Sequence, residues 1–115
     1  MKKYLLVIAV ICTTFMYGQE NPVKIVFDVT TSDEATHQAA VRHVKMMAAA
    51  YPQSEFEVVM YSGSINMVLT DKSTVSEDII SLSENENVSF KVCAGTMKRY
   101  KTSESDLIKG VEIVP

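Results

Sequence analysis

Short apolar runs rich in β-branched and aromatic residues recur along the chain after residue 22, and longer segments with helical spacing separate them. Apolar runs of this length, bounded by turn residues, are typical of β-strands. The pattern therefore predicts four strands, at residues 23–30, 56–61, 88–93 and 111–114.

Helical segments are predicted between these strands. Residues 35–50 contain no Gly or Pro and place Ala40, Val44 and Met47 at helical spacing. Residues 31–34 supply a cap and acidic residues for the first turn of this helix, and Pro52 ends it. A capping-box pattern predicts a second helix that runs through Leu82. The remaining segments are a turn at 62–64, an apolar segment at 65–69, the capping box at 74–77, a turn at 94–96, a basic stretch at 97–101 and a helical turn at 103–106.

Strands that alternate with helices predict an α/β fold with a parallel sheet and right-handed crossovers. Because four strands leave three crossovers, we expect two helices on one face of the sheet and one on the other. Polar residues occupy one parity of the predicted strands, at Lys24, Asp28, Glu57, Ser89 and Lys91. This pattern predicts either a partly solvated face or a face covered by another subunit, and we favour self-association.

The first residues of the chain have a different character from the rest. Lys2 and Lys3 precede an uncharged stretch at residues 4–16, and small or polar residues follow it. This order is typical of a secretory signal peptide, and the apolar run is shorter than the about 20 residues that a spanning helix needs. We therefore expect a signal peptide at residues 1–18, cleaved near Gly18, a single domain at residues 19–115 and a periplasmic location. The alternative is an uncleaved N-terminal anchor.

The composition is that of an ordinary globular protein. The 115 residues are 47% hydrophobic and 22% charged, which argues against disorder and against a multi-pass membrane protein. The net charge is −3, and loss of Lys2 and Lys3 with the leader would change it to −5. This acidic balance argues against a general binder of nucleic acid or of anionic membranes, since both need a basic surface. We therefore expect no nucleic-acid partner and no stable membrane association after cleavage. No phosphate-binding loop, zinc spacing or Ser-His-Asp order is present, and we expect no cofactor.

Of the two cysteines, Cys12 falls within the predicted leader and Cys93 remains without a partner for an intramolecular disulfide. Cys93 is the last residue of the third predicted strand, at the strand end where open α/β sheets place their sites. A helix start predicted near Thr96 would present unpaired N–H groups that favour the thiolate. Lys98 and Arg99 would add positive potential.

These features predict a nucleophilic or persulfide-carrying cysteine, with Gly95 allowing a substrate to approach the backbone. The alternative is a buried and inert cysteine, which is common among free cysteines. Cys93 shares strand parity with Ser89 and Lys91 rather than with the apolar residues between them. That parity favours an accessible thiol.

Four segments of the chain together carry a family pattern. Residues 90–98 read Phe-Lys-Val-Cys-Ala-Gly-Thr-Met-Lys, a strand that ends in Cys and is followed by a turn. Residues 105–115 contain a Leu segment that ends in Gly-Val, residues 57–65 a strand with a glycine turn, and residues 40–45 a helical pattern. Over nearly all of the chain after the leader, this sequence resembles the DsrE/DsrF-like family.

The resemblance implies a three-layer α/β/α fold with a flavodoxin-like wind and assembly into a homotrimer or homohexamer. It also implies a cysteine that handles sulfur, which in sulfur-relay members is accepted as a persulfide and passed on. Carried over to this sequence, that role falls to Cys93, with Gly95, Thr96 and Lys98 as its turn. A sulfurtransferase-like enzyme is one form of this function, with a thiol protein as the sulfur donor or acceptor.

The sequence departs from the family pattern in three respects. The best-understood relay members are cytoplasmic, whereas the predicted leader indicates export. Family members usually continue past the final Val-Pro with a helix and a strand that this sequence does not contain. No second cysteine follows the leader, so transfer of the sulfur would need a partner thiol. The alternative function is a non-enzymatic, oligomeric periplasmic binding or scaffold protein with a buried structural cysteine.

Histidine and methionine supply the remaining candidate ligands. His37 and His43 lie six residues apart, about 120° around a helix, so they do not face one metal ion. We interpret both as solvated or capping, although His43 could approach Cys93 near the strand ends. Methionines together with Cys93 raise the alternative of a Cu(I) site. Because no Met-x-x-Met cluster occurs, we interpret the methionines as core residues and expect no metal. The methionines concerned are Met46, Met47, Met60, Met67 and Met97.

Overall fold

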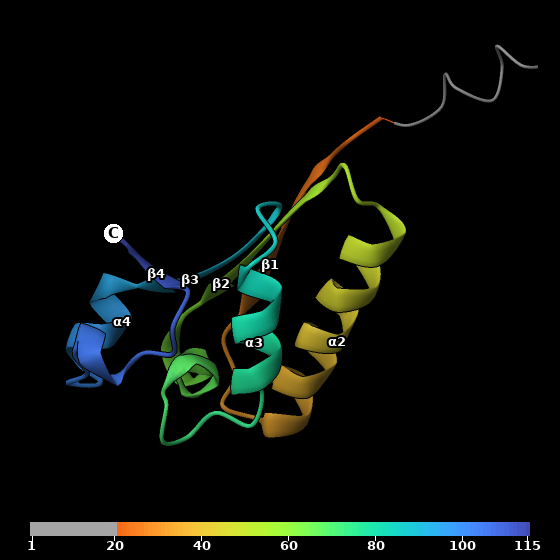
Figure 1. Ribbon diagram of the computed structural model, residues 1–115. Helices are drawn as coiled ribbons and strands as arrows, with labels where there is room; N and C mark the ends of the chain where they lie inside the picture. Colours follow the sequence, from red (N-terminus) through yellow and green to blue (C-terminus); the bar gives the residue numbers. More distant parts are fainter. Residues whose placement is uncertain (1–20) are drawn as a thin grey trace, which may run out of the picture.

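The computed structural model of the protein describes residues 21–115, so the expected signal peptide and Cys12 lie outside the described residues. A four-stranded sheet crosses the middle of the fold (Figure 1). All neighbouring strands are parallel, which confirms the predicted α/β class and parallel sheet. The strands are β1 (Lys24–Val29), β2 (Glu55–Met60), β3 (Val88–Cys93) and β4 (Val111–Val114).

Helices form every connection between consecutive strands. The long helix α2 (Glu34–Ala50) joins β1 to β2, close to its predicted bounds. The predicted apolar segment forms a 3-10 helix, η1 (Ser62–Val68), which precedes α3 (Ser76–Ser83). The connection from β3 to β4 contains α4 (Ala94–Arg99) and a single 3-10 turn, η2 (Glu104–Asp106).

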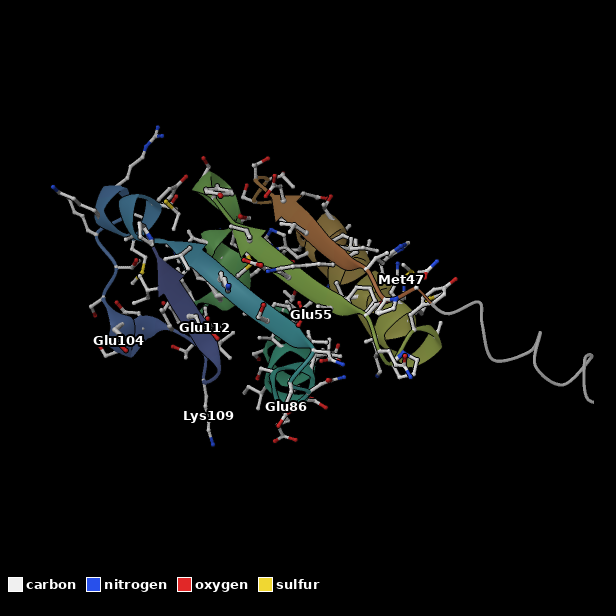
Figure 2. All side chains as sticks on the ribbon, turned by 90° about the horizontal axis from the view of Figure 1, so that it is seen from above. Met47, Glu55, Glu86, Glu104, Lys109 and Glu112 are labelled. Atoms are coloured by element: carbon white, nitrogen blue, oxygen red, sulfur yellow. The ribbon has the colours of Figure 1, made fainter. Side chains whose placement is uncertain are left out.

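The order of the strands in the sheet is β1-β2-β3-β4, the same as their order in the chain. Right-handed crossovers between strands in this order place every connecting helix on the same face. Figure 2 shows the sheet from its other face, with the helices behind it. The expected split of two helices and one helix is therefore corrected. Over residues 21–115 the fold has two layers rather than the implied three, and the strand order lacks the reversal of a flavodoxin-like wind.

The hydrophobic core lies between the sheet and this single layer of helices. Register places Phe27, Val58, Phe90 and Val111 in one row across all four strands. Phe56, Val58, Phe90 and Val92 are at most 1% exposed, because alternate side chains of a strand point to the same face. The helices bury apolar residues against this row, including Val41, Val44, Ile65, Met67, Val68 and Ile79.

The opposite face of the sheet carries the polar parity that the sequence predicts. Glu57 of β2 forms ion pairs with Lys24 of β1, at 3.4 Å, and with Lys91 of β3, at 3.1 Å. Hydrogen bonding from Lys91, with a smaller effect of Lys24, lowers the pKa of the Glu57 carboxyl. One carboxylate therefore pairs with two ammonium groups and links three strands on this face. We call this set, Lys24, Glu57 and Lys91, the ion-pair ladder.

The predicted N-terminal cap of α2 is confirmed, and the predicted capping box of α3 is wrong. The Asp33 carboxylate caps α2, accepting hydrogen bonds from the Thr36 N–H at 2.9 Å and the Thr36 hydroxyl at 2.7 Å. The capping box predicted at residues 74–77 is not formed, because α3 begins after Val75 with no side-chain cap. The hydroxyl of Ser73 instead accepts a hydrogen bond from the Val75 N–H at 3.1 Å.

Candidate functional site

The carboxyl ends of the four parallel strands meet at one edge of the sheet, and the candidate site lies there. Register aligns Val29 with Met60, Met60 with Val92, and Cys93 with Val114. The loops that follow β1 and β2 and the start of α4 therefore lie side by side. Open α/β sheets carry their chemistry at this edge.

Cys93 ends β3 and is also the N-cap residue of α4. Its side chain is half-buried, whereas Phe90 and Val92 on the other parity of β3 are fully buried. The helix begins at Ala94, two residues before the predicted start at Thr96. Gly95 and Thr96 consequently lie in the first helical turn, where backbone N–H groups have no partner within the helix.

These backbone donors change the acidity of the thiol. The pKa of Cys93 is lowered from its usual value, most of all by hydrogen bonding from the Thr96 backbone N–H. The Gly95 N–H and the Thr96 hydroxyl act in the same direction, while partial burial opposes them. These donors lie close enough to the sulfur to lower its pKa, although their geometry falls short of a regular capping hydrogen bond. The arrangement favours the nucleophilic thiolate.

Thr96 connects this turn to the loop after β2. Its side chain is nearly buried, and its Oγ1 accepts a hydrogen bond from the Ser62 N–H at 3.2 Å. Ser62 adopts a left-handed conformation with φ of 52°, which is uncommon for a residue with a side chain. Ser62 was not a predicted site residue. Its contact with Thr96 joins residues 34 positions apart, and no local sequence signal indicates it.

Of the other predicted residues of the turn, Gly95 lies beside the sulfur, whereas Lys98 does not contribute to its lowered pKa. A Cβ atom at position 95 would lie 3.6 Å from Sγ of Cys93, so glycine leaves that side of the sulfur uncovered. Lys98 is exposed in the last turn of α4, next to Arg99. Neither base is among the groups that lower the pKa of Cys93. Backbone donors take the place of the positive side chains that the sequence suggested.

Both histidines lie away from the sulfur. His37 is 2% exposed, and its Nε2 lies 2.6 Å from the carbonyl oxygen of Thr31, which ties α2 to the loop after β1. The ring of His43 packs edge-on against Phe27 of β1 at 6.0 Å, on the helix-covered side of the sheet. Since Cys93 has the opposite parity on β3, the two do not meet. Within residues 21–115 no group of three or more His, Cys, Asp or Glu side chains could hold a metal ion.

Most of the methionines considered as soft ligands are core residues. Met60 and Met67 are fully buried and Met97 is 6% exposed, all within the hydrophobic core. Met46 lies on the exposed side of α2, and Met47 is partly buried against the core. In the described part of the chain, no helix has the length and apolar character needed to cross a membrane.

Comparison with known proteins agrees with this fold. A protein of unknown function from Methanobacterium thermoautotrophicum, MTH1491, is 28% identical, with a TM-score of 0.73 over 82% of each chain. The ychN protein of E. coli is 17% identical, with a TM-score of 0.67 over 83% of this chain and 85% of ychN, which shows likeness of fold alone. No curated protein sequence matches the chain. Residues 24–115 match the DsrE/DsrF-like family, and the chain therefore belongs to that family.

Proposed function

We propose that this protein is a sulfur carrier, in which Cys93 accepts a sulfur atom as a persulfide and passes it to a thiol of another protein. The observation that carries the proposal is the environment of the thiol. Cys93 is half-buried at the carboxyl edge of a parallel sheet, with backbone donors that lower its pKa. Membership of the DsrE/DsrF-like family supports the same function.

The transfer needs no external oxidant. The Cys93 thiolate attacks the outer sulfur of a donor persulfide, R–S–SH, and a new S–S bond forms while the S–S bond of the donor breaks. The donor leaves as the thiolate R–S⁻, so the sulfane sulfur keeps its oxidation state. An acceptor thiolate then attacks the outer sulfur on Cys93 in the same way and releases Cys93 as a thiolate. A lowered pKa favours both steps, because Cys93 is the nucleophile in the first and the leaving group in the second.

The proposal includes the setting of the reaction. Cys93 is the free cysteine of residues 21–115, so the acceptor thiol would belong to a different molecule. The basic and apolar order of residues 1–18 supports export to the periplasm, and family membership supports a homotrimer or homohexamer.

Mass spectrometry tests the proposal. The folded protein is treated with a glutathione persulfide donor, digested with trypsin and searched for the peptide at residues 92–98, which lies between two lysine cleavage sites and contains Cys93. We expect this peptide to gain about 32 Da, the mass of one sulfur atom, and to lose it on addition of a second thiol. Cys93→Ser removes the gain, whereas Cys12→Ser, at the other cysteine, retains it.

The alternative of a binding or scaffold protein predicts a different result. If the peptide stays unmodified in the folded protein but reacts once the protein is denatured, Cys93 is protected and the carrier function is wrong. A Cys93→Ala variant that assembles normally and complements a deletion strain would then support the scaffold. Circular dichroism of each variant shows whether the fold is retained.

A further inference from the structure

Strand β1 lies at the edge of the sheet, and its outer side has no strand partner among residues 21–115. On its inner side, Val23 O accepts a hydrogen bond from Glu55 N–H at 2.9 Å, and Val29 O accepts one from Tyr61 N–H at 3.0 Å. Backbone groups of successive strand residues point to alternate sides. The N–H and C=O groups of Lys24, Val26 and Asp28 therefore point outward, where another strand could bind them.

The side chains along this edge are incompletely covered. Ile25 and Phe27 have the parity of the core but are only half-buried, and Val26 is 51% exposed. A shallow groove of about 630 Å³ runs between the outer side of β1 and the flank of α2. None of the α2 residues that line this groove is Lys, Arg, Asp or Glu, and Arg42 and Lys45 line a different depression beside α3. The flank residues that line the groove are Thr36, Ala39, Ala40 and His43.

We propose that the outer edge of β1 binds β1 of a second copy of this chain, in antiparallel orientation about a two-fold axis through Val26. In this register Val26 lies opposite the second copy's Val26, and Lys24 lies opposite the second copy's Asp28. Opposite charges at directly paired positions stabilise antiparallel strands. Asp28 forms no ion pair with any residue of the part of the chain that the structure describes, so it is available for this contact.

Backbone geometry selects this register. Two directly opposite residues exchange hydrogen bonds only if the backbone groups of both point at the partner strand. The second copy can therefore shift along β1 only in steps of two residues, which keep Lys24, Val26 and Asp28 opposite outward-pointing residues. Sliding one step toward the N-terminus places Pro22, which has no N–H, opposite Asp28. Sliding one step the other way places Asp28 opposite Val26 and leaves both charges without an opposite partner. Of these three registers, the one centred on Val26 both forms the backbone hydrogen bonds and places Lys24 opposite Asp28.

The apolar positions fit the same arrangement. Ile25 lies opposite the second copy's Phe27 on the helix-covered side, so each copy extends the half-buried row of the other. The small side chains of Ala39 and Ala40 leave room beside β1 for these residues. Two four-stranded sheets then join into one of eight strands, in an isologous contact that closes on itself. Pairing also removes the free edge of β1 in both copies.

Exchanging the charges at Lys24 and Asp28 tests the proposal. Assembly is measured by sedimentation velocity, on protein purified in the form that cells produce after any processing. We expect the wild-type protein to form dimers or assemblies with an even number of copies, so of the two assemblies proposed above this contact fits the homohexamer and not the homotrimer. Lys24→Glu and Asp28→Lys each place like charges opposite one another in a homodimer, so each should raise the dissociation constant about tenfold. A one-to-one mixture of the two single variants should restore dimers at wild-type concentrations, because each charge then meets its opposite. The double variant Lys24→Glu/Asp28→Lys should dimerise alone.

Controls separate this result from misfolding. Rescue by mixing does not occur if a single variant is unfolded, and circular dichroism checks each variant alone. Val26→Pro removes an outward N–H without touching the hydrogen bonds to β2, so it should also prevent dimers. A wild-type monomer at the highest soluble concentration overturns the proposal and leaves the edge to a strand of another protein. So does an oligomer, including a trimer, whose dissociation constant neither single variant changes. Because Lys24 and Asp28 lie outside the Cys93 site, persulfide formation in these variants tests the two proposals separately.

Discussion

At the scale of single residues, the reactivity proposed for Cys93 depends on how many donors surround one sulfur. The strongest effect comes from the Thr96 backbone N–H, which every substitution except proline retains. The Thr96 hydroxyl contributes less to the lowered pKa but also holds the Ser62 N–H. Thr96 therefore has both an electrostatic and a structural role at the site.

Replacing the Thr96 hydroxyl separates these roles. Thr96→Val should raise the pKa of Cys93 partway toward its usual value, so the alkylation rate should rise at a higher pH than in the wild type. Loss of the Ser62 hydrogen bond should also cost about 1 kcal/mol of unfolding free energy. The measurement is the iodoacetamide rate as a function of pH. Thr102→Val is the control, because its hydroxyl contacts the Met97 carbonyl rather than the Cys93 turn. An unchanged pH profile in Thr96→Val would contradict the role of the hydroxyl.

At the scale of elements, the ion-pair ladder joins three strands through one carboxylate. Glu57 contacts Lys24 on one neighbouring strand and Lys91 on the other, and its side chain is 15% exposed. Its folded-state pKa is lowered, so its contribution to stability is fully present above the unfolded-state pKa of about 4.3. That contribution is lost as the pH falls through the lower folded-state pKa.

Glu57→Gln should therefore cost about 1 kcal/mol of unfolding free energy at pH 7, and this difference from the wild type should disappear at acidic pH. Urea unfolding at a series of pH values measures it. Glu55→Gln on the same strand is the matched control, because Glu55 is exposed and forms no ion pair with residues 21–115. An equal loss in both variants at neutral pH would show that the ladder does not stabilise the sheet.

At the scale of the whole molecule, one hydrophobic core contacts every strand and the helical layer. The core includes η1 and the segment after η2, where Ile108 N–H donates to Val68 O at 2.8 Å. A single core of this kind predicts one cooperative unfolding transition. The adjacent residues Ile79 and Ile80 of α3 allow a direct test, since they are 0% and 37% exposed.

Ile79→Ala should lower the free energy of unfolding by about 2–5 kcal/mol, because it removes fully buried methyl groups and leaves a cavity. Tyrosine fluorescence and far-ultraviolet circular dichroism should report the same shifted transition. Ile80→Ala should change it by much less. Separate transitions for the two probes would argue against a single cooperative core.

Local pattern in the sequence determined the elements and the place of the candidate site. Strand alternation predicted the four strands, the polar face with Glu57 and Lys91, and the position of Cys93 at a strand end, because side-chain direction in a strand depends only on parity. Only the tertiary structure decided the strand order, which places all the helices on one face. It also brought Ser62 to Thr96 and Lys24 to Glu57. These contacts depend on how segments about thirty residues apart align in register, and no short-range period in the sequence carries that information.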